Sequence, residues 1–130
     1  MNSVRRATIE DCKLIVRLGK RSVTYAHRDS CPPEILKGYI EPNYNDRAIT
    51  NDVSDKRNLY HIIENEGEPV GFSKMVLNQK QADIHQQPVA KLDRIYVLRE
   101  YYGRKLGYEL FTFNANLARE NGQQGIWLDG

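Results

Sequence analysis

The stretch "LDRIYVLREYYGRKLGYELF" at residues 92–111 joins two patterns that predict different secondary structures. The run up to Leu98 is apolar and typical of a strand, whereas apolar residues recur at helical spacing over 103–122. Between them lie Gly103 and Gly107, with the basic Arg104 and Lys105 beside them. This stretch therefore predicts a strand that passes through a short glycine-containing turn into a helix.

Such a turn has two interpretations. The first N–H groups of a helix have no internal partner and the helix dipole is positive there, so the turn could hold a phosphate. The same residues also serve as an ordinary connection between a strand and a helix. Neither GxxxxGK[ST] nor GxGxxG is present, so the spacing alone leaves both interpretations open.

The rest of the chain predicts a mixed fold in a single domain over 1–130. Thr8 and Asp11 resemble a capping box at the start of a helix. We expect strands at 3–7, 59–66, 70–78, 89–98 and 125–130, helices at about 9–27, from Pro32, within 43–57 and at 103–122, a turn at 66–69, and a polar loop at 78–87. The order β-α-α-α-β-β-β-α-β predicts an α+β (mixed α/β) fold. Its sheet is mostly antiparallel, with one right-handed β-α-β crossover at the end.

Composition narrows the possible functions. The net charge is +2, from 19 basic and 17 acidic residues, which argues against a nucleic-acid-binding face. No apolar run approaches the length of a membrane span, and the N-terminus lacks the apolar core of a signal peptide. Cys12 and Cys31 lie in no metal-binding pattern. We therefore expect a soluble cytoplasmic protein with reduced thiols and no metal.

The opening stretch resembles motif A of the GNAT superfamily of N-acetyltransferases. Residues 92–97, "LDRIYV", match the family's strand pattern L-[ED]-x-[IL]-Y-V, and residues 102–107, "YGRKLG", occupy its Q/R-x-x-G-x-G/A loop. The segments 5–15, 60–78 and 125–130 are similar to the family's other strands and first helix, so the likeness covers the whole chain. "PPEILKGYI" (32–40) and "IWL" (126–128) look most like the PaiA-type polyamine acetyltransferases.

The resemblance implies a ternary complex in which an amine attacks the thioester of acetyl-CoA directly. In this family, a bulge in the fourth strand exposes backbone amides that hold the pantetheine arm. Here that segment comprises Ile95, Tyr96, Val97 and Leu98, with the Val97 N–H as the donor to the acetyl carbonyl. The pyrophosphate would lie on the amides of Tyr102, Gly103, Arg104, Lys105, Leu106 and Gly107. The implied acceptor is a small-molecule amine, with a polyamine as one candidate.

The attacking amine must lose a proton, and Asp93 is our candidate base because the family often has a carboxylate there. We expect its side chain to share the face of Ile95 and Val97, since all three alternate along one strand. Two alternatives remain open: a structural carboxylate paired with Lys91 or Arg94, and a binding site for a cationic substrate. His61 is expected to be a core or surface residue, not a catalyst.

Two departures from the family pattern leave a second function open. Tyr102 and Lys105 stand where the family prefers Gln or Arg and glycine. The family also continues past the fifth strand into a helix and a hairpin, which often carry the tyrosine thought to protonate the departing thiolate. This chain ends at Gly130, so we expect an N-acetyltransferase-like domain without that region. The alternative is a non-catalytic CoA-binding or interaction domain, and the exposed sheet edge favours a homodimer.

Overall fold

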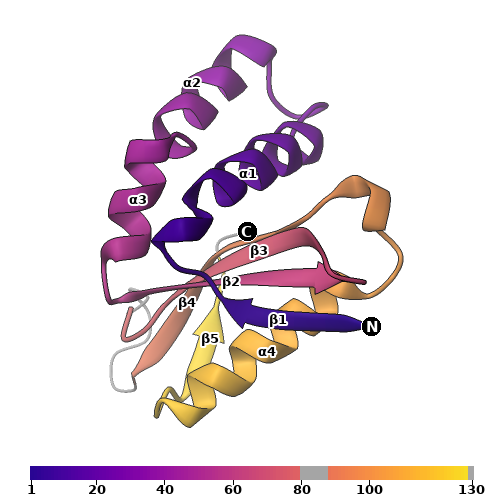
Figure 1. Ribbon diagram of the computed structural model, residues 1–130. Coiled ribbons are helices and arrows are strands. Elements are labelled where there is room, and N and C mark those ends of the chain that lie inside the picture. Colours follow the sequence, from indigo (N-terminus) through magenta and orange to yellow (C-terminus); the bar gives the residue numbers. More distant parts are fainter. Residues whose placement is uncertain (80–87, 129–130) are drawn as a thin grey trace.

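The computed structural model describes residues 1–79 and 88–128 and confirms the predicted order of elements (Figure 1). In chain order these are β1 (Asn2–Arg6), the 3-10 turn η1 (Ile9–Asp11), α1 (Cys12–Ala26), α2 (Pro33–Asn43), α3 (Asp46–Ser54), β2 (Asn58–Asn65), β3 (Glu68–Val76), β4 (Val89–Val97), the 3-10 turn η2 (Arg99–Tyr101), α4 (Leu106–Glu120) and β5 (Gly125–Trp127). From residue 80 on, the polar loop expected at 78–87 lies outside the described residues. So do the last two residues of the strand expected at 125–130.

The five strands form one sheet in the order β1-β2-β3-β4-β5. Neighbouring strands are antiparallel except β4 and β5, which pair in parallel. Helix α4 connects this parallel pair, as the predicted β-α-β crossover requires. The turn between β2 and β3 carries Glu66 and Gly67 at positive φ, as a tight hairpin demands.

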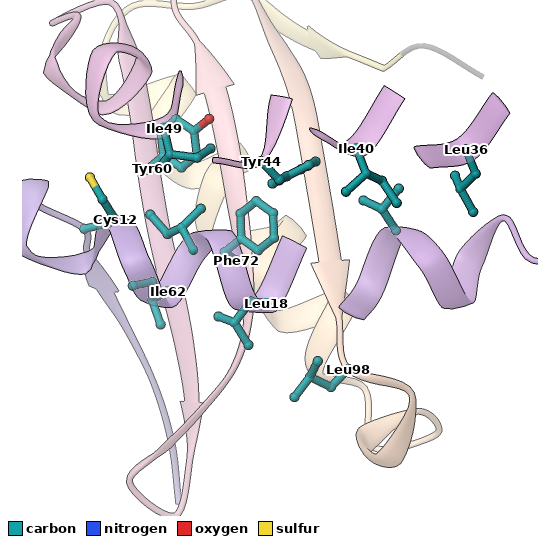
Figure 2. Packing of buried hydrophobic residues seen from close by; sticks show 13 residues of the cluster. Cys12, Leu18, Leu36, Ile40, Tyr44, Ile49, Tyr60, Ile62, Phe72 and Leu98 are labelled. Carbon is teal, nitrogen blue, oxygen red and sulfur yellow. The ribbon is translucent and has the colours of Figure 1, made fainter. Parts of the chain in front are cut away.

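Helices cover both faces of the sheet, with α1, α2 and α3 on one side and α4 on the other (Figure 1). Phe72 of β3 is fully buried under the three-helix layer (Figure 2). The rings of Tyr44, Tyr60 and Tyr96 lie 6.2, 6.4 and 5.9 Å from its ring. Each such side chain contributes about 1.5–3 kcal/mol by leaving water, so this aromatic group anchors the helices on the sheet.

Two local features of the helical layer follow from the sequence. The predicted capping box is present, since Thr8 Oγ accepts from Glu10 N and Asp11 Oδ2 accepts from Thr8 N. Gly19 of α1 allows the close approach of Tyr44, because a Cβ at this position would lie 2.2 Å from the tyrosine ring. In the described part of the chain, no helix is both long and apolar enough to cross a membrane.

Helix α4 begins three residues later than expected, at Leu106 instead of 103. Gly103 has φ 82° and Lys105 has φ 61°, so neither residue can belong to a right-handed helix. The helix ends as expected, with Gly122 at φ 77° directly after the C-cap residue Asn121. The positive φ angles thus make 103–105 a turn in front of the helix.

The register of β4 against β3 corrects one expectation. Lys74 pairs with Arg94 while Met75 pairs with Leu92, so Asp93 is the extra residue of a β-bulge. The bulge breaks the alternation of side chains along β4. Asp93 therefore faces Lys74 and the three-helix layer, whereas Ile95 and Val97 pack in the clusters of α4. The prediction that Asp93 shares their face was wrong because alternation holds only in an unbulged strand.

Candidate active site

The turn before α4 presents backbone N–H groups in the way that anion sites do. Lys105 is the N-cap residue, and its side chain makes no capping hydrogen bond to the helix. The first N–H groups of α4 lack carbonyl partners within the helix, and the positive end of the helix dipole lies there. The turn thus offers directed donors and positive charge to a ligand.

A pocket of about 420 Å³ lies in front of these donors. Its lining contains Val97, Tyr101, Tyr102, Gly103, Lys105, Leu106 and Gly107, so most of the residues expected to hold a phosphate come together here. A Cβ at Gly107 would meet no atom within 4 Å, so the fold itself does not need a glycine at this position. Its absent side chain leaves room for a ligand to approach the backbone.

The two tyrosines of the turn differ. Tyr101 packs against the buried clusters on both sides of the sheet. Tyr102 is 53% exposed, and its ring makes an edge contact with Tyr25 of α1 at 5.8 Å. Tyr101 therefore supports the turn, while Tyr102 forms a wall of the pocket.

The outer edge of β4 opens next to this pocket. Strand β5 pairs with β4 at Val89–Lys91, and in the described residues no further pairing follows along this edge. The opening from Lys91 to Val97 is about 20 Å long at 3.3 Å per residue. The Leu98 N–H donates to the Val70 carbonyl at 2.8 Å, toward β3. Because successive N–H groups of a strand point to opposite edges, the Val97 and Ile95 N–H groups point into the opening.

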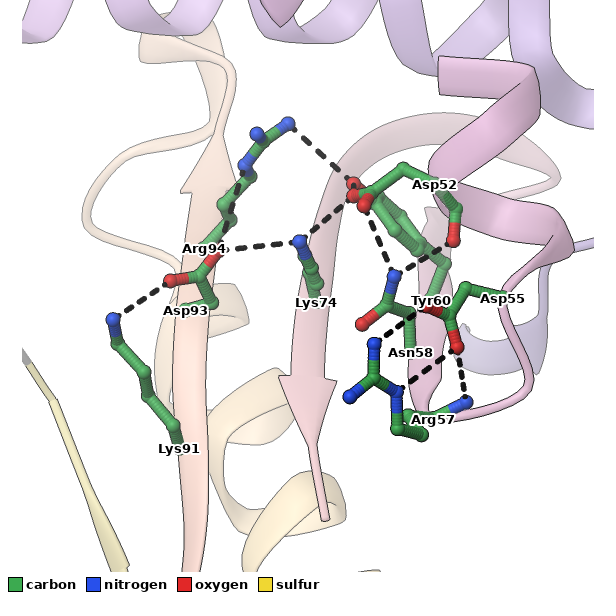
Figure 3. A network of polar contacts seen from close by, with 9 residues as sticks. All are labelled: Asp52, Asp55, Arg57, Asn58, Tyr60, Lys74, Lys91, Asp93 and Arg94. Atoms are coloured by element: carbon green, nitrogen blue, oxygen red, sulfur yellow. Dashed lines mark hydrogen bonds and ion pairs between the residues drawn. The ribbon is translucent and has the colours of Figure 1, made fainter. Parts of the chain in front are cut away.

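Asp93 lies in a network of polar contacts at the bulge (Figure 3). Its carboxylate is 3.1 Å from Lys91 Nζ, 3.4 Å from Lys74 Nζ and 3.9 Å from Arg94 Nε. Burial by itself would raise the pKa of Asp93, but the hydrogen bond from Lys91 and the charges of Lys74 and Arg94 outweigh it and lower that pKa. Lys91 and Arg94 are the two partners expected if Asp93 is a structural carboxylate.

The same network reaches α3 and β2. Asp52 of α3 lies 2.8 Å from Lys74 Nζ and accepts a hydrogen bond from the Tyr60 hydroxyl. Arg94 Nη1 donates to the same hydroxyl at 3.4 Å. The side chain of Lys74 is only 12% exposed and bridges the two carboxylates. The sequence pointed to the pairs of Asp93 with Lys91 and Arg94 but not to Asp52, Tyr60 or Lys74, because these come from three further elements that only the fold brings together.

Neither of the two described histidines lines the pocket at the turn. His61 is 3% exposed on the α4 side of the sheet, where its ring contacts Phe113 at 4.8 Å, so it is a core residue as expected. Burial, together with the charge of Arg6, lowers the pKa of His61 to about 4. His27 follows α1, and His85 lies outside the described residues.

Comparison with known proteins identifies a family. The family described as "Acetyltransferase (GNAT) family" matches residues 22–130. The chain belongs to the GNAT acetyltransferase family. An uncharacterized N-acetyltransferase of Lactobacillus delbrueckii subsp. lactis is 23% identical over 101 residues, which cover 78% of this chain and 58% of that protein. The chain thus spans less than two thirds of the length of this curated relative.

Solved structures of N-acetyltransferases share the fold. The PaiA N-acetyltransferase from Thermoplasma acidophilum, in complex with coenzyme A, superposes with a TM-score of 0.80 at 18% identity, covering 95% of this chain and 75% of that one. An aminoglycoside N-acetyltransferase in complex with CoA gives a TM-score of 0.74 at 15% identity, covering 100% of this chain and 77% of that one. The predicted family, fold class and likeness to PaiA are confirmed, and at these identities the likeness concerns the fold.

Proposed function

We propose that this GNAT chain is an acetyl-CoA-dependent N-acetyltransferase that acts on a primary amine of a small molecule. The observation that carries the proposal is the edge of β4 beyond Lys91, with which no described residue pairs, and the Val97 N–H directed into this opening directly before the turn at α4. Acetyl-CoA is a thioester joined to a pyrophosphate. This arrangement offers a donor for the thioester carbonyl and a cradle for the phosphates.

The proposed contacts follow the direction of each backbone group. The amides of the turn from Tyr102 to Gly107, with the charges of Arg104 and Lys105, hold the pyrophosphate. The outward N–H groups of Ile95 and Val97 contact the pantetheine arm and the acetyl group. Tyr96 and Leu98 flank them with their amides toward β3.

The proposed reaction is a direct transfer in a ternary complex. The amine nitrogen attacks the acetyl carbon, a C–N bond forms, the C–S bond breaks, and the thiolate leaves with the electron pair of that bond. The Val97 N–H stabilises the oxyanion of the tetrahedral intermediate, and one such donor contributes about 2.7–4 kcal/mol. The amine gives up one proton, and the leaving thiolate takes one up.

The proton acceptor stays a prediction. The side chain of Asp93 points toward the three-helix layer, but its lowered pKa makes it a weak base. A carboxylate held by three cations also has little freedom to turn toward an amine. These contacts favour a chain of waters as the acceptor, with Asp93 fixing the bulge that shapes β4.

A non-catalytic CoA-binding domain is the second candidate. It is favoured by Lys105, whose left-handed conformation is one that a non-glycine residue adopts at a cost. Both candidates share the pyrophosphate cradle and differ only in turnover.

Two measurements separate these candidates. Calorimetric titration with acetyl-CoA tests the cradle, and release of the free thiol of CoA with a panel of amines, including putrescine and spermidine, tests transfer. Binding with turnover supports the enzyme, and binding without turnover supports the second candidate. Absence of binding contradicts both.

A proline at position 97 tests the assigned donor. Val97→Pro removes an N–H that the sheet does not use, and proline is tolerated at such an edge. We expect acetyl-CoA binding and the unfolding midpoint to stay close to those of the unmodified chain, while kcat falls about 100- to 1000-fold. Unchanged kcat in the folded variant would show that Val97 is not the oxyanion donor.

The proposed setting is the cytoplasm, supported by the free thiols of Cys12 and Cys31, which suit a reducing compartment. A polyamine acceptor is the candidate that the likeness to PaiA suggests. A homodimer stays a prediction.

A further inference from the structure

A groove of about 460 Å³ lies between the C-terminal half of α1 and the turn after β4, which Figure 1 shows on the same side of the molecule. Four basic side chains line it: Lys20, Arg21, Arg28 and Arg99. Its lining contains a single carboxylate, Glu100, which pairs with Arg21 at 2.6 Å. The groove lining contains no second carboxylate to neutralise Lys20, Arg28 and Arg99.

The geometry of the arginines holds this charge in place. Arg28 Cζ lies 3.7 Å and Arg99 Cζ 5.2 Å from the centre of the Tyr25 ring, so one ring orients two guanidinium groups. Arg28 has a highly exposed partner, Asp29, at 3.6 Å. In the described part of the chain, neither Lys20 nor Arg99 has an ion pair within 4.0 Å. Like charges gathered in a concave site create a field that favours an anion.

The groove is next to the proposed transfer site, on its other face. Leu98 lines the groove and packs with the three-helix layer, whereas its neighbour Val97 lines the pocket at α4 and packs with that helix. Consecutive Cα atoms are 3.8 Å apart. A molecule in the groove would therefore reach the acetyl group at Val97 from the side opposite the pyrophosphate, where an attacking amine needs room.

The carboxylates of this face do not offer a site for a polycation. Asp52, Asp55 and Asp93 line a pocket at β3 and β4, where Asp52 and Asp93 pair with Lys74 and Asp55 pairs with Arg57. Glu41, which lines a pocket together with Lys20, pairs with Lys37 at 3.7 Å. Asp93 has two further cations near it, Lys91 and Arg94. A polyamine would meet occupied carboxylates here and repulsion from Lys20, Arg28 and Arg99.

We propose that this groove binds an acidic group, a phosphate or a carboxylate, of the acetyl acceptor. The acceptor is then an amine that also carries negative charge, not a polyamine. The guanidinium groups suit a planar or tetrahedral oxyanion, because they donate two parallel hydrogen bonds. The transfer step rests on the proposed function, while the binding of an acidic group to the groove does not.

Matched amines test the acceptor class through the rate of CoA thiol release. O-phosphoethanolamine is compared with ethanolamine, and 4-aminobutyrate with putrescine, because each pair keeps an amine and changes the charge at the other end. We expect kcat/KM to be about tenfold or more higher for the acidic member of each pair. A preference for ethanolamine and putrescine would overturn the proposal.

Charge removal in the groove tests the residues. Arg99→Gln removes one groove cation, and Arg17→Gln is its matched control, since Arg17 is exposed on α1 and outside the groove lining. Arg99→Gln should lower kcat/KM for O-phosphoethanolamine about tenfold and leave that for ethanolamine unchanged. Arg17→Gln should change neither. An equal loss for both amines, or no loss for either, would contradict the assignment.

Direct binding keeps this test independent of turnover. Calorimetric titration of O-phosphoethanolamine into the chain should show binding that Arg99→Gln weakens, whether or not any amine is acetylated. Failure to bind acetyl-CoA would overturn the proposed function alone, and failure to bind O-phosphoethanolamine would overturn the groove alone. If Arg99→Gln weakens binding of CoA but not of dephospho-CoA, the groove holds the nucleotide phosphate of CoA, and the acceptor proposal is wrong.

Discussion

Replacement of Lys105 separates backbone conformation from charge in the turn that we propose binds phosphate. Lys105 is exposed and has φ 61° and ψ 20°, the left-handed conformation that the family pattern provides with glycine. For a residue with a Cβ this conformation costs about 1–2 kcal/mol. Because the backbone already adopts it, Lys105→Gly changes the strain and the charge but not the path of the turn.

The free energy of unfolding follows from two opposing contributions. Glycine relieves the strain of about 1–2 kcal/mol in the folded chain, but it adds about 0.5–1 kcal/mol of entropy cost on folding. We therefore expect Lys105→Gly to be more stable than Lys105→Ala by about 1 kcal/mol, because alanine keeps the strain. For a domain of this size, that difference corresponds to an unfolding midpoint about 4 °C higher.

CoA affinity should change in the opposite direction. Both variants lose an ammonium beside the proposed pyrophosphate, and an exposed charge at about 4 Å contributes about 1 kcal/mol. Calorimetry should therefore give a Kd about fivefold higher for Lys105→Gly, with a smaller salt dependence than for the unmodified chain. A Kd lower than that of the unmodified chain would refute this reasoning, since it would mean that Lys105 impairs the cradle.

Four further substitutions test the packing, the pH dependence of stability and the bulge. Gly19→Ala should lower the free energy of unfolding by about 1–3 kcal/mol, because its Cβ would lie 2.2 Å from the Tyr44 ring. Gly38→Ala, in open space on α2, should instead raise that free energy by about 0.5–1 kcal/mol. An increase in stability for Gly19→Ala as well would contradict the close contact between Gly19 and Tyr44. The pKa of His61 is about 4 in the folded chain, below its ordinary value of 6.5. Its contribution to stability is therefore complete above pH 6.5 and is lost as the pH falls below 6.5, because the unfolded chain then binds a proton that the folded chain does not. Denaturant titration should show about 2 kcal/mol less stability at pH 5 than at pH 7 relative to His61→Gln, and equal pH profiles would exclude this linkage. Asp93→Asn should lower the unfolding midpoint and reduce kcat less than tenfold, whereas a loss of about 100-fold without destabilisation would identify Asp93 as the base.

Local patterns were sufficient for most of the architecture. The capping box at Thr8, the stop at Gly122 and the order of elements depend on neighbouring residues, so they could be predicted. The start of α4 could not, because helical spacing of apolar residues does not reveal the positive φ of Lys105. The face of Asp93 could not either, since a bulge depends on the register of β4 against a strand that is distant in sequence.

The sequence by itself determined the family, the fold class and the position of the turn between β4 and α4, because these follow from the order of elements along the chain and from the motif at 92–107. The tertiary structure alone decided which groups meet across elements. It paired Asp93 with Lys74, directed the Val97 N–H into the opening of β4, and placed Arg99 beside the end of α1. Such contacts join residues far apart in the chain, and they form only when the sheet and its two helical layers are packed together.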